Sequence, residues 1–260
     1  MEELVVLKFG GAVLADEAHR REALASVAAI QQLRLLVHGG GSTATDVAEK
    51  LGVESNFIDG RRITTSEMRD VALMVYGGLL NKQIVSELQQ SGCNALGLSG
   101  ADGELICGKK REAEINFGYV GDIYSVNVNL ISQLLSFQIT PVVAPLSFDK
   151  THGLLNTNAD TIAATIAASL TKNFRVRLLL CFDKSGVLKD PQDEQSVIAE
   201  LSQKDFTTLA KSGTISAGML PKLSNGFAAR TAGVVEARII HWRDVVDALR
   251  GEAVGTALEK

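Results

Sequence analysis

Cysteine and net positive charge are both scarce in this chain of 260 residues. The 3 cysteines, Cys93, Cys107 and Cys181, lie far apart without a C-x-x-C pair, which argues against a disulfide framework and favours a reducing, cytoplasmic location. Lysine and arginine number 26 against 30 aspartates and glutamates, giving a net charge of −4. Because no overall positive field is present, the sequence argues against nucleic acid or an anionic membrane as a partner.

Long apolar runs are missing as well. The first short apolar run follows Glu2 and Glu3 and ends at Lys8, unlike the basic start and long apolar stretch of a signal peptide. The longest stretch without charge, residues 125–148, contains several polar residues and two prolines, so it predicts a helix, a turn and a buried strand rather than a membrane span. With 46% apolar and 22% charged residues, the composition is that of a soluble globular protein.

Short apolar runs alternate with longer amphipathic segments along the chain. Such runs are typical of buried, mostly parallel strands, and the alternation predicts an α/β sandwich. The expected strands are residues 4–7, 35–37, 95–98, 142–144, 178–182 and 237–240. The expected helices are residues 17–32, 43–51, 66–90, 127–137, 159–170 and 220–231.

Local signals refine this outline. Thr64 followed by Glu67 is a capping-box pattern that predicts the start of the long helix, and Pro221 suits the first turn of another. The glycine-rich and charged segment 105–123 predicts an antiparallel hairpin that could border a site. The polar stretch 171–177 is a plausible seam, so we expect two lobes, residues 1–172 and 173–260, on one continuous sheet.

Two glycine turns follow the first two expected strands. Lys8-Phe9-Gly10-Gly11 places an ammonium group beside exposed backbone N–H groups at the edge where open α/β sheets bind ligands, although a solvated lysine before a turn explains this motif equally well. His38-Gly39-Gly40-Gly41 precedes a helix, whose N-terminus favours an anion. Neither turn matches the nucleotide-binding patterns G-x-x-x-x-G-K-[ST] or G-x-G-x-x-G.

Lys222 and Asp160 each lie near the start of an expected helix. In Ser216-Ala217-Gly218-Met219-Leu220-Pro221-Lys222 the helix dipole disfavours the cation, and a bound phosphate would offset that repulsion. In Asn156-Thr157-Asn158-Ala159-Asp160 the carboxylate is favourable for capping alone, but the two asparagines exceed what capping needs. The sequence therefore predicts a site for anionic groups.

Asp59-Gly60-Arg61-Arg62 lies in an expected loop just before the long helix. A guanidinium group there could grip a carboxylate through two parallel hydrogen bonds. A pair of solvated arginines is the alternative interpretation of the same residues.

Taken in order, these motifs resemble the amino acid kinase family from Val5 to Trp242. The resemblance is carried by K-F-G-G, V-H-G-G-G, D-G-R-R-I-T, L-S-G-A-D-G, V-G-D-I, N-T-N-A-D, D-K-S-G-V and G-M-L-P-K. It implies one domain, a three-layer α/β/α sandwich with a mainly parallel central sheet. It also implies that lobe 1–172 binds an acyl amino acid and that lobe 173–260 binds ATP.

The resemblance assigns roles to particular residues. Lys8 and Lys222 would contact the transferring phosphoryl group, and Asp160 would hold both lysines. Arg62 would bind the substrate α-carboxylate, and Asn156 and the Gly40-Gly41 backbone would complete the substrate-binding site. The family pattern further implies backbone N–H donors at Gly10, Gly11, Gly40 and Gly41 and a nucleotide contact at Asp183, in the stretch that continues through Leu188-Lys189-Asp190-Pro191. Cys181-Phe182 departs from the smaller or polar residues expected before Asp183.

The implied reaction transfers the γ-phosphoryl group of ATP to the side-chain carboxylate of N-acetyl-L-glutamate, a step of arginine biosynthesis. Because that carboxylate is already deprotonated, no general base is needed, and Mg²⁺ is expected to arrive with ATP rather than in a protein cage. N-succinylglutamate remains an alternative substrate. Aspartate, carbamate and uridylate kinases are less favoured, and a non-catalytic sensor of ATP or an amino acid is the alternative from another class.

The resemblance also implies a homodimer. Helix 66–90, with the apolar residues Val71, Leu73, Met74 and Val75, could supply a symmetric surface. Family members that arginine inhibits form hexamers through an N-terminal helical extension. Because the sequence starts close to its first strand, we expect no arginine inhibition.

Overall fold

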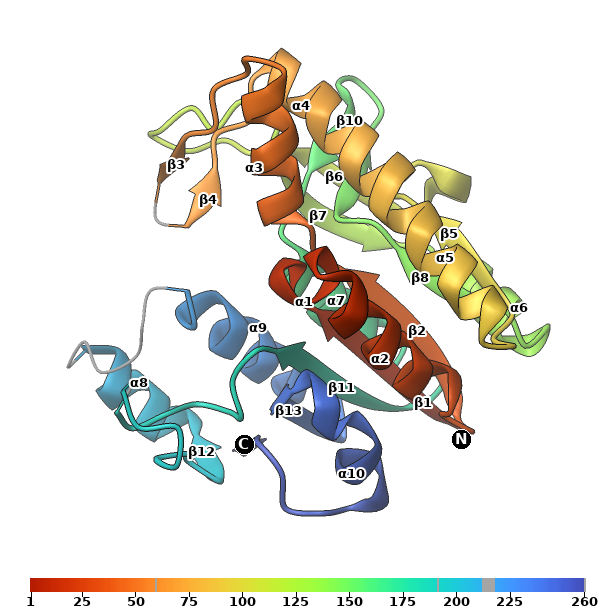
Figure 1. Ribbon diagram of the computed structural model, residues 1–260, viewed down its shortest axis with the longest axis vertical. Helices are drawn as coiled ribbons and strands as arrows, with labels where there is room; N and C mark the ends of the chain where they lie inside the picture. The colour runs from red at the N-terminus through yellow and green to blue at the C-terminus, as the bar shows by residue number, and fades with distance from the viewer. Residues whose placement is uncertain (59, 191, 212–217, 260) are drawn as a thin grey trace.

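The computed structural model describes residues 1–58, 60–190, 192–211 and 218–259. The main sheet of the described chain has the strand order β12-β14-β13-β11-β1-β2-β8-β5 (Figure 1). All neighbours in it are parallel except β13 and β14. Its strands are β1 (Glu3–Phe9), β2 (Leu33–His38), β5 (Ala95–Leu98), β8 (Thr140–Val143), β11 (Arg175–Phe182), β12 (Glu200–Ser202), β13 (Glu236–His241) and β14 (Thr256–Glu259).

The six predicted strands are β1, β2, β5, β8, β11 and β13, which lie side by side in this sheet. The strands β12 and β14 were not predicted, because each is short and mixes a glutamate with its apolar residues, so neither carries a clear apolar pattern. The sheet divides at the expected seam: β11 and its neighbours β13, β14 and β12 come from the chain after residue 172, and β1, β2, β8 and β5 come from before it.

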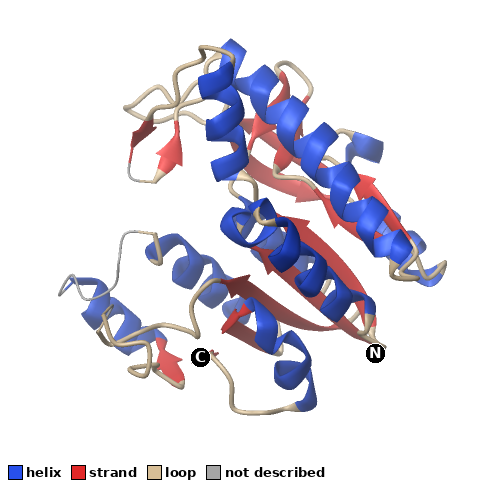
Figure 2. Ribbon diagram, in the orientation of Figure 1, coloured by secondary structure: helices blue, strands red, loops and turns tan. Residues whose placement is uncertain are grey.

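Helices cover both faces of the main sheet (Figure 2). Along β1, Leu4 and Val6 join one core with helices behind one face, whereas Val5, Leu7 and Phe9 join the core of the opposite face. The predicted three-layer α/β/α sandwich is therefore confirmed. The helices are α1 (Gly11–Ala15), α2 (Glu17–Ala28), α3 (Gly41–Lys50), α4 (Ser66–Ala72), α5 (Asn81–Gln90), α6 (Val128–Ser136), α7 (Ala159–Ser169), α8 (Gln203–Lys211), α9 (Leu220–Thr231) and α10 (Val245–Arg250), with short 3₁₀ turns η2 (Asp102–Glu104) and η3 (Trp242–Asp244).

The long helix predicted at residues 66–90 forms in three consecutive parts. Helix α4 continues into a π-helical stretch, η1 (Leu73–Leu80), and then into α5. The predicted cap was wrong by one residue: Thr65, not Thr64, accepts the hydrogen bond from the Met68 N–H. The Thr64 hydroxyl is engaged elsewhere, because it donates to the Arg62 carbonyl at 3.2 Å and accepts from Asn156 Nδ2 at 3.0 Å.

A second, four-stranded sheet has the order β10-β9-β6-β7. Strands β6 (Ile106–Lys110) and β7 (Gly121–Val126) are antiparallel and confirm the hairpin predicted at residues 105–123. Strands β9 (Leu146–Asp149) and β10 (Gly153–Asn156) complete this sheet, and the two-residue strands β3 (Phe57–Ile58) and β4 (Arg61–Arg62) form a small ribbon of their own.

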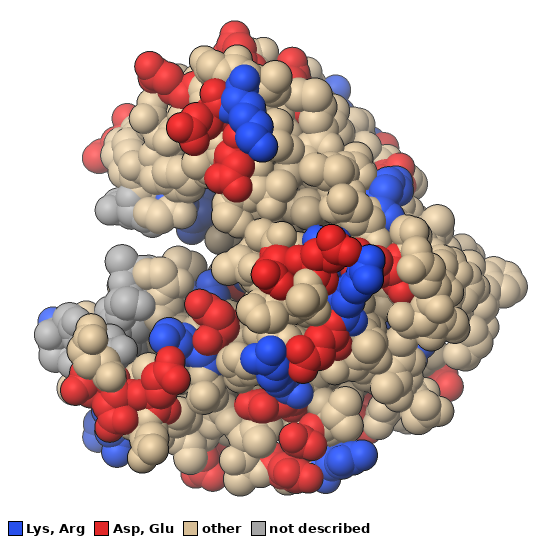
Figure 3. Space-filling model, viewed as in Figure 1, with Lys and Arg blue, Asp and Glu red and all other residues tan. Residues whose placement is uncertain are grey.

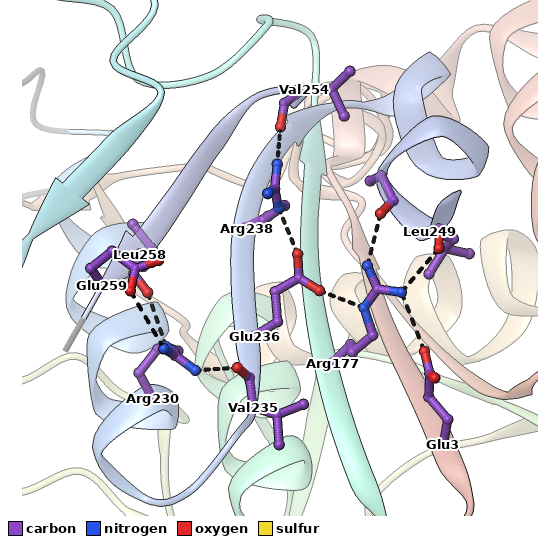
Figure 4. Close-up of polar contacts among 11 residues, drawn as sticks. Glu3, Arg177, Arg230, Val235, Glu236, Arg238, Leu249, Val254, Leu258 and Glu259 are labelled. Carbon is purple, nitrogen blue, oxygen red and sulfur yellow. Dashed lines mark hydrogen bonds and ion pairs between the residues drawn. The ribbon is translucent and has the colours of Figure 1, made fainter. Parts of the chain in front are cut away.

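A network of arginines ties the C-terminal segment to the amino ends of the central strands (Figure 4). Arg177 on β11 pairs with Glu3 on β1 and with Glu236 on β13, at 3.2 and 2.5 Å, and donates to the Leu249 carbonyl. Arg238 links Glu236 to the Val254 carbonyl. The network stabilises the end of the sheet opposite the one where Lys8 lies.

No helix in the described part of the chain is both long and apolar enough to cross a membrane.

Candidate active site

Three charged side chains from distant segments meet at the carboxyl end of β1. Because side chains alternate along a strand, Lys8 points to the same face as Leu4 and Val6, which is the face that α7 covers. Lys8 Nζ lies 2.7 Å from Asp160 Oδ1 in the first turn of α7, and Lys222 Nζ donates to Asp160 Oδ2 at 3.2 Å. Lys222 comes from the first turn of α9, so one lysine from each side of the seam contacts one carboxylate.

Burial sets the electrostatics of this triad. The side chains of Lys8 and Asp160 are each 6% exposed and that of Lys222 is 20% exposed. Burial lowers the pKa of Lys8, Lys222 lowers it further, and Asp160 opposes both effects without cancelling them. Burial alone would raise the pKa of Asp160, but the two lysines hold it below its ordinary value. The triad therefore carries two positive charges against one negative charge, which leaves an excess that suits a bound anion.

Two glycine turns pack directly against each other beside Lys8. A Cβ atom on Gly11 would come 2.9 Å from the Gly40 nitrogen, and one on Gly40 would come 2.4 Å from Leu80 Cδ1. Gly11 and Gly41 are the first residues of α1 and α3, so their N–H groups have no partner within their own helices. The Gly40 N–H likewise donates to no group in the described residues.

The structure contradicts the expectation that Gly10 offers its N–H to a ligand. That N–H donates to the Cys181 carbonyl at 3.1 Å, which continues the pairing of β1 with β11 beyond the last residue of β1. The predicted donor set is thus reduced to Gly11, Gly40 and Gly41.

The glycine turns border a cavity of about 220 Å³, which Lys8, Asp160, Arg62 and Asn156 also line. Figure 3 shows the face with the opening, which lies between the part of the molecule that carries α3 and the part that carries α8 and α9. The structure therefore brings the predicted substrate-binding residues and the lysine–aspartate triad to one place.

Arg62 enters this cavity from β4 as a buried cation. Its Nη2 donates to the Gly41 carbonyl at 2.8 Å and to Thr45 Oγ1 at 2.9 Å, and its guanidinium group lies 4.5 Å from the centre of the Phe57 ring. These neutral groups orient the side chain without neutralising it. No described carboxylate forms an ion pair with Arg62, so a ligand carboxylate would complete its environment.

Asn156 also lines the cavity, at the end of β10. Its Nδ2 donates to Thr64 Oγ1 at 3.0 Å, and its backbone N–H donates to the Tyr119 carbonyl. The side-chain oxygen accepts no hydrogen bond from the residues that the structure describes and stays available to a ligand N–H. Asn158, two residues further on, caps α7 through the Thr161 N–H, so the capping role falls to Asn158 rather than Asp160.

Asp183 follows β11 at the same edge of the sheet but does not line the cavity, and its side chain is exposed. The turn after Asp183 is held in place by β14, because the Val187 N–H donates to Thr256 Oγ1 on that strand at 2.8 Å. Of the other predicted motif residues, Asp59, Pro191, Ser216 and Ala217 lie outside the described residues.

Several cavity residues were not predicted from the sequence. Tyr76 contributes from the π-helical stretch, and Pro145 precedes β9. Val120, from the predicted hairpin segment, borders the cavity as that segment was expected to do. Arg61, which was singled out only as the neighbour of Arg62, also lines the cavity.

Comparison with known proteins agrees with this geometry. Residues 3–241 match the model of the "Amino acid kinase family". The chain is 49% identical to the acetylglutamate kinase of Parabacteroides distasonis over 90% of this chain and 92% of that protein, and 43% identical to the acetylglutamate kinase of Phocaeicola vulgatus over 100% and 99%. A solved structure of a Streptococcus mutans protein has the same fold, with a TM-score of 0.81 and 22% identity over 98% of both chains.

Proposed function

The chain belongs to the amino acid kinase family, and we propose that it has acetylglutamate kinase activity. It transfers the γ-phosphoryl group of ATP to the side-chain carboxylate of N-acetyl-L-glutamate in arginine biosynthesis. The observation that supports this most strongly is the contact of Lys8 and Lys222 with one buried aspartate, beside a cavity in which Arg62 has no carboxylate partner.

The cavity residues have separate roles in substrate binding and in phosphoryl transfer. Arg62 binds the α-carboxylate of the substrate, and the Asn156 side-chain oxygen accepts from its amide N–H. The substrate side-chain carboxylate then attacks the γ-phosphorus, a P–O bond forms to it, and the P–O bond to ADP breaks. Lys8, Lys222 and the N–H groups of Gly11, Gly40 and Gly41 stabilise the negative charge on the transferring group. Asp160 keeps the two ammonium groups apart and aimed at that group.

The nucleotide is assigned to lobe 173–260, and the acyl amino acid to lobe 1–172. Asp183 and the turn that follows it offer the nucleotide contacts, because they leave the sheet at the carboxyl end of β11, next to Lys8 on β1. The described residues contain no group of three histidine, cysteine, aspartate or glutamate side chains placed to hold a metal. Mg²⁺ is assigned to the ATP phosphates, with which it is proposed to arrive, and it would neutralise part of their charge there. The assigned location is the cytoplasm.

A direct test measures ADP release by the purified protein with N-acetyl-L-glutamate and with N-succinyl-L-glutamate side by side. Faster turnover of the acetyl substrate supports the proposal. Release of ADP with neither substrate would favour a non-catalytic sensor on the same fold.

N-succinylglutamate is the second candidate substrate because of Arg61. This residue lines the same cavity, and its guanidinium group has no hydrogen-bond or ion-pair partner in the described part of the chain. Burial lowers the pKa of Arg61, and nearby Arg111 lowers it further while Asp122 opposes the effect. A succinyl group carries a second carboxylate that could pair with this cation, whereas an acetyl group offers no such charge.

Replacing Arg62 with alanine is expected to raise the KM for the acylglutamate about ten- to a hundredfold, because a charged hydrogen bond to a ligand is worth about 1.5–3 kcal/mol. The value of kcat should change little, since the contact lies away from the transferring group. Steady-state kinetics with ATP saturating measure both. Arg61→Ala is the matched control, and a larger rise of KM in that variant would assign the α-carboxylate to Arg61.

The protein is further proposed to form a homodimer through η1. Of the apolar residues predicted to supply the contact, Val71 and Val75 are buried within the chain's own core. Leu73 and Met74 are 41% and 52% exposed, and Leu79 adds a third exposed apolar side chain on the same stretch at 45%.

Met74→Glu is expected to convert the dimer into a monomer, because a charge would be buried in an apolar contact. Light scattering after size-exclusion chromatography gives the mass of each species. Leu51→Glu, at an exposed leucine on the end of α3, is the control that should leave the mass unchanged. A monomeric wild-type protein would contradict the proposal.

A further inference from the structure

His38 is a fully buried titratable residue to which the proposed reaction gives no task. It is the last residue of β2 and directly precedes Gly39, Gly40 and Gly41. A polar side chain in such a place must find partners for both ring nitrogens or destabilise the fold. The partners that it finds connect it to the glycine turn.

The hydrogen bonds of His38 define its tautomer. The Nδ1 atom lies 2.9 Å from the Gly39 carbonyl oxygen, which can only accept, so Nδ1 carries the proton. The Nε2 atom lies 3.2 Å from Asn81 Nδ2, which can only donate, so Nε2 accepts. Burial lowers the pKa of His38 to about 4, which keeps the ring neutral at physiological pH.

Asn81 is itself held by two other strands, by β8 directly and by β5 through the neighbouring Lys82. Its Nδ2 also donates to the Val142 carbonyl on β8 at 3.0 Å, and its Oδ1 accepts from Lys82 Nζ at 3.2 Å. Lys82 Nζ in turn donates to the Gly97 carbonyl on β5. Because an amide nitrogen only donates and an amide oxygen only accepts, this chain fixes which end of the Asn81 side chain faces His38.

The bond from His38 to Gly39 determines where the next N–H group points. The Gly39 carbonyl and the Gly40 N–H belong to one planar trans peptide, in which they point in opposite directions. When the carbonyl is turned to His38, the Gly40 N–H is turned away from it. Gly40 lines the cavity, and its N–H has no other acceptor among the described residues.

We propose that His38 and Asn81 are positioning residues that aim the Gly40 N–H at the phosphoryl group transferred beside Lys8 and Lys222. The inference rests on the proposed function of this site. His38 does not exchange a proton with substrate; it holds a peptide plane so that one transition-state donor is in place before the substrate arrives.

The tautomer can be measured without any substrate. Correlation spectra of the full-length protein labelled with ¹⁵N at its 4 histidines report which ring nitrogen carries the proton, and the spectrum of His38→Asn assigns the His38 signals. The proposal expects the Nδ1–H form. A neutral Nε2–H form would overturn it, since such a ring cannot donate to the Gly39 carbonyl.

Two substitutions separate positioning from packing. The side-chain nitrogen of asparagine can take the place of Nδ1, whereas that of glutamine takes the place of Nε2. His38→Asn should therefore retain kcat within about threefold, and His38→Gln should lose about ten- to a hundredfold in kcat with little change in either KM. Thermal unfolding of both variants measures any loss of stability separately.

Equal losses of kcat in the two variants, or losses that follow the fall in unfolding temperature, would overturn the positioning role. If the wild-type protein phosphorylated neither acylglutamate, the proposed function would fail instead. In that event the tautomer measurement would still decide whether His38 holds the Gly39 carbonyl.

Discussion

Lys8→Met is expected to lower kcat about a hundredfold and to leave the KM for both substrates nearly unchanged. Methionine retains most of the buried length of the side chain, so the change removes the charge rather than the packing. A preorganised donor to a developing anion is worth about 3 kcal/mol in the transition state. The same contact is weaker in the ground state, so the loss should fall on kcat.

Lys222→Met should show a loss of similar size, because both ammonium groups face the same transferring group from opposite sides of the seam. Lys50→Met, at an exposed lysine in the last turn of α3, controls for a general effect of removing one positive charge. Single-turnover rates measured with saturating MgATP report the chemical step. Near-normal rates in either site variant would reject the role assigned to that lysine.

The layered architecture could be predicted from the sequence because its central strands are buried on both faces. Runs such as residues 178–182 therefore read as uninterrupted apolar segments. Helices such as α2 and α6 separate several of these strands along the chain. The short strands β12 and β14 lack this signal: each includes a glutamate beside its apolar residues, and their pairing depends on a tertiary neighbour rather than on their own pattern.

The candidate site was predictable where its chemistry follows strand ends and helix starts. Lys8, Asp160 and Lys222 each lie at such a boundary, and these boundaries converge at one edge of the sheet. The use of the Gly10 N–H could not be predicted, because it depends on which strand lies beside β1. Tyr76 was missed for a related reason: nothing in its own helix distinguishes a cavity-lining aromatic from a core residue.

Asp160→Asn is expected to destabilise the protein by about 3 kcal/mol at neutral pH and to lower kcat strongly. Asparagine keeps the shape of the carboxyl group but leaves two lysines, one of them almost fully buried, without a counter-charge. Removing one partner of a buried ion pair typically costs about 3–5 kcal/mol. The fall in kcat follows because Lys8, already lowered in pKa by burial, would lose its proton more readily once Asp160 no longer opposes that shift.

The pH dependence gives this prediction a distinctive sign. A lysine whose folded pKa lies below its unfolded value of about 10.4 binds fewer protons in the folded state over the interval between them, so stability rises with pH there. The free energy of unfolding of Asp160→Asn, measured with urea, should therefore approach that of the wild type between pH 7 and pH 9.5. The kcat of this variant should fall over the same range. Asp46→Asn, at an exposed acid on α3, should show neither effect. If the difference in the free energy of unfolding between wild type and Asp160→Asn stayed constant with pH, Asp160 would act through packing and not through the charges of Lys8 and Lys222.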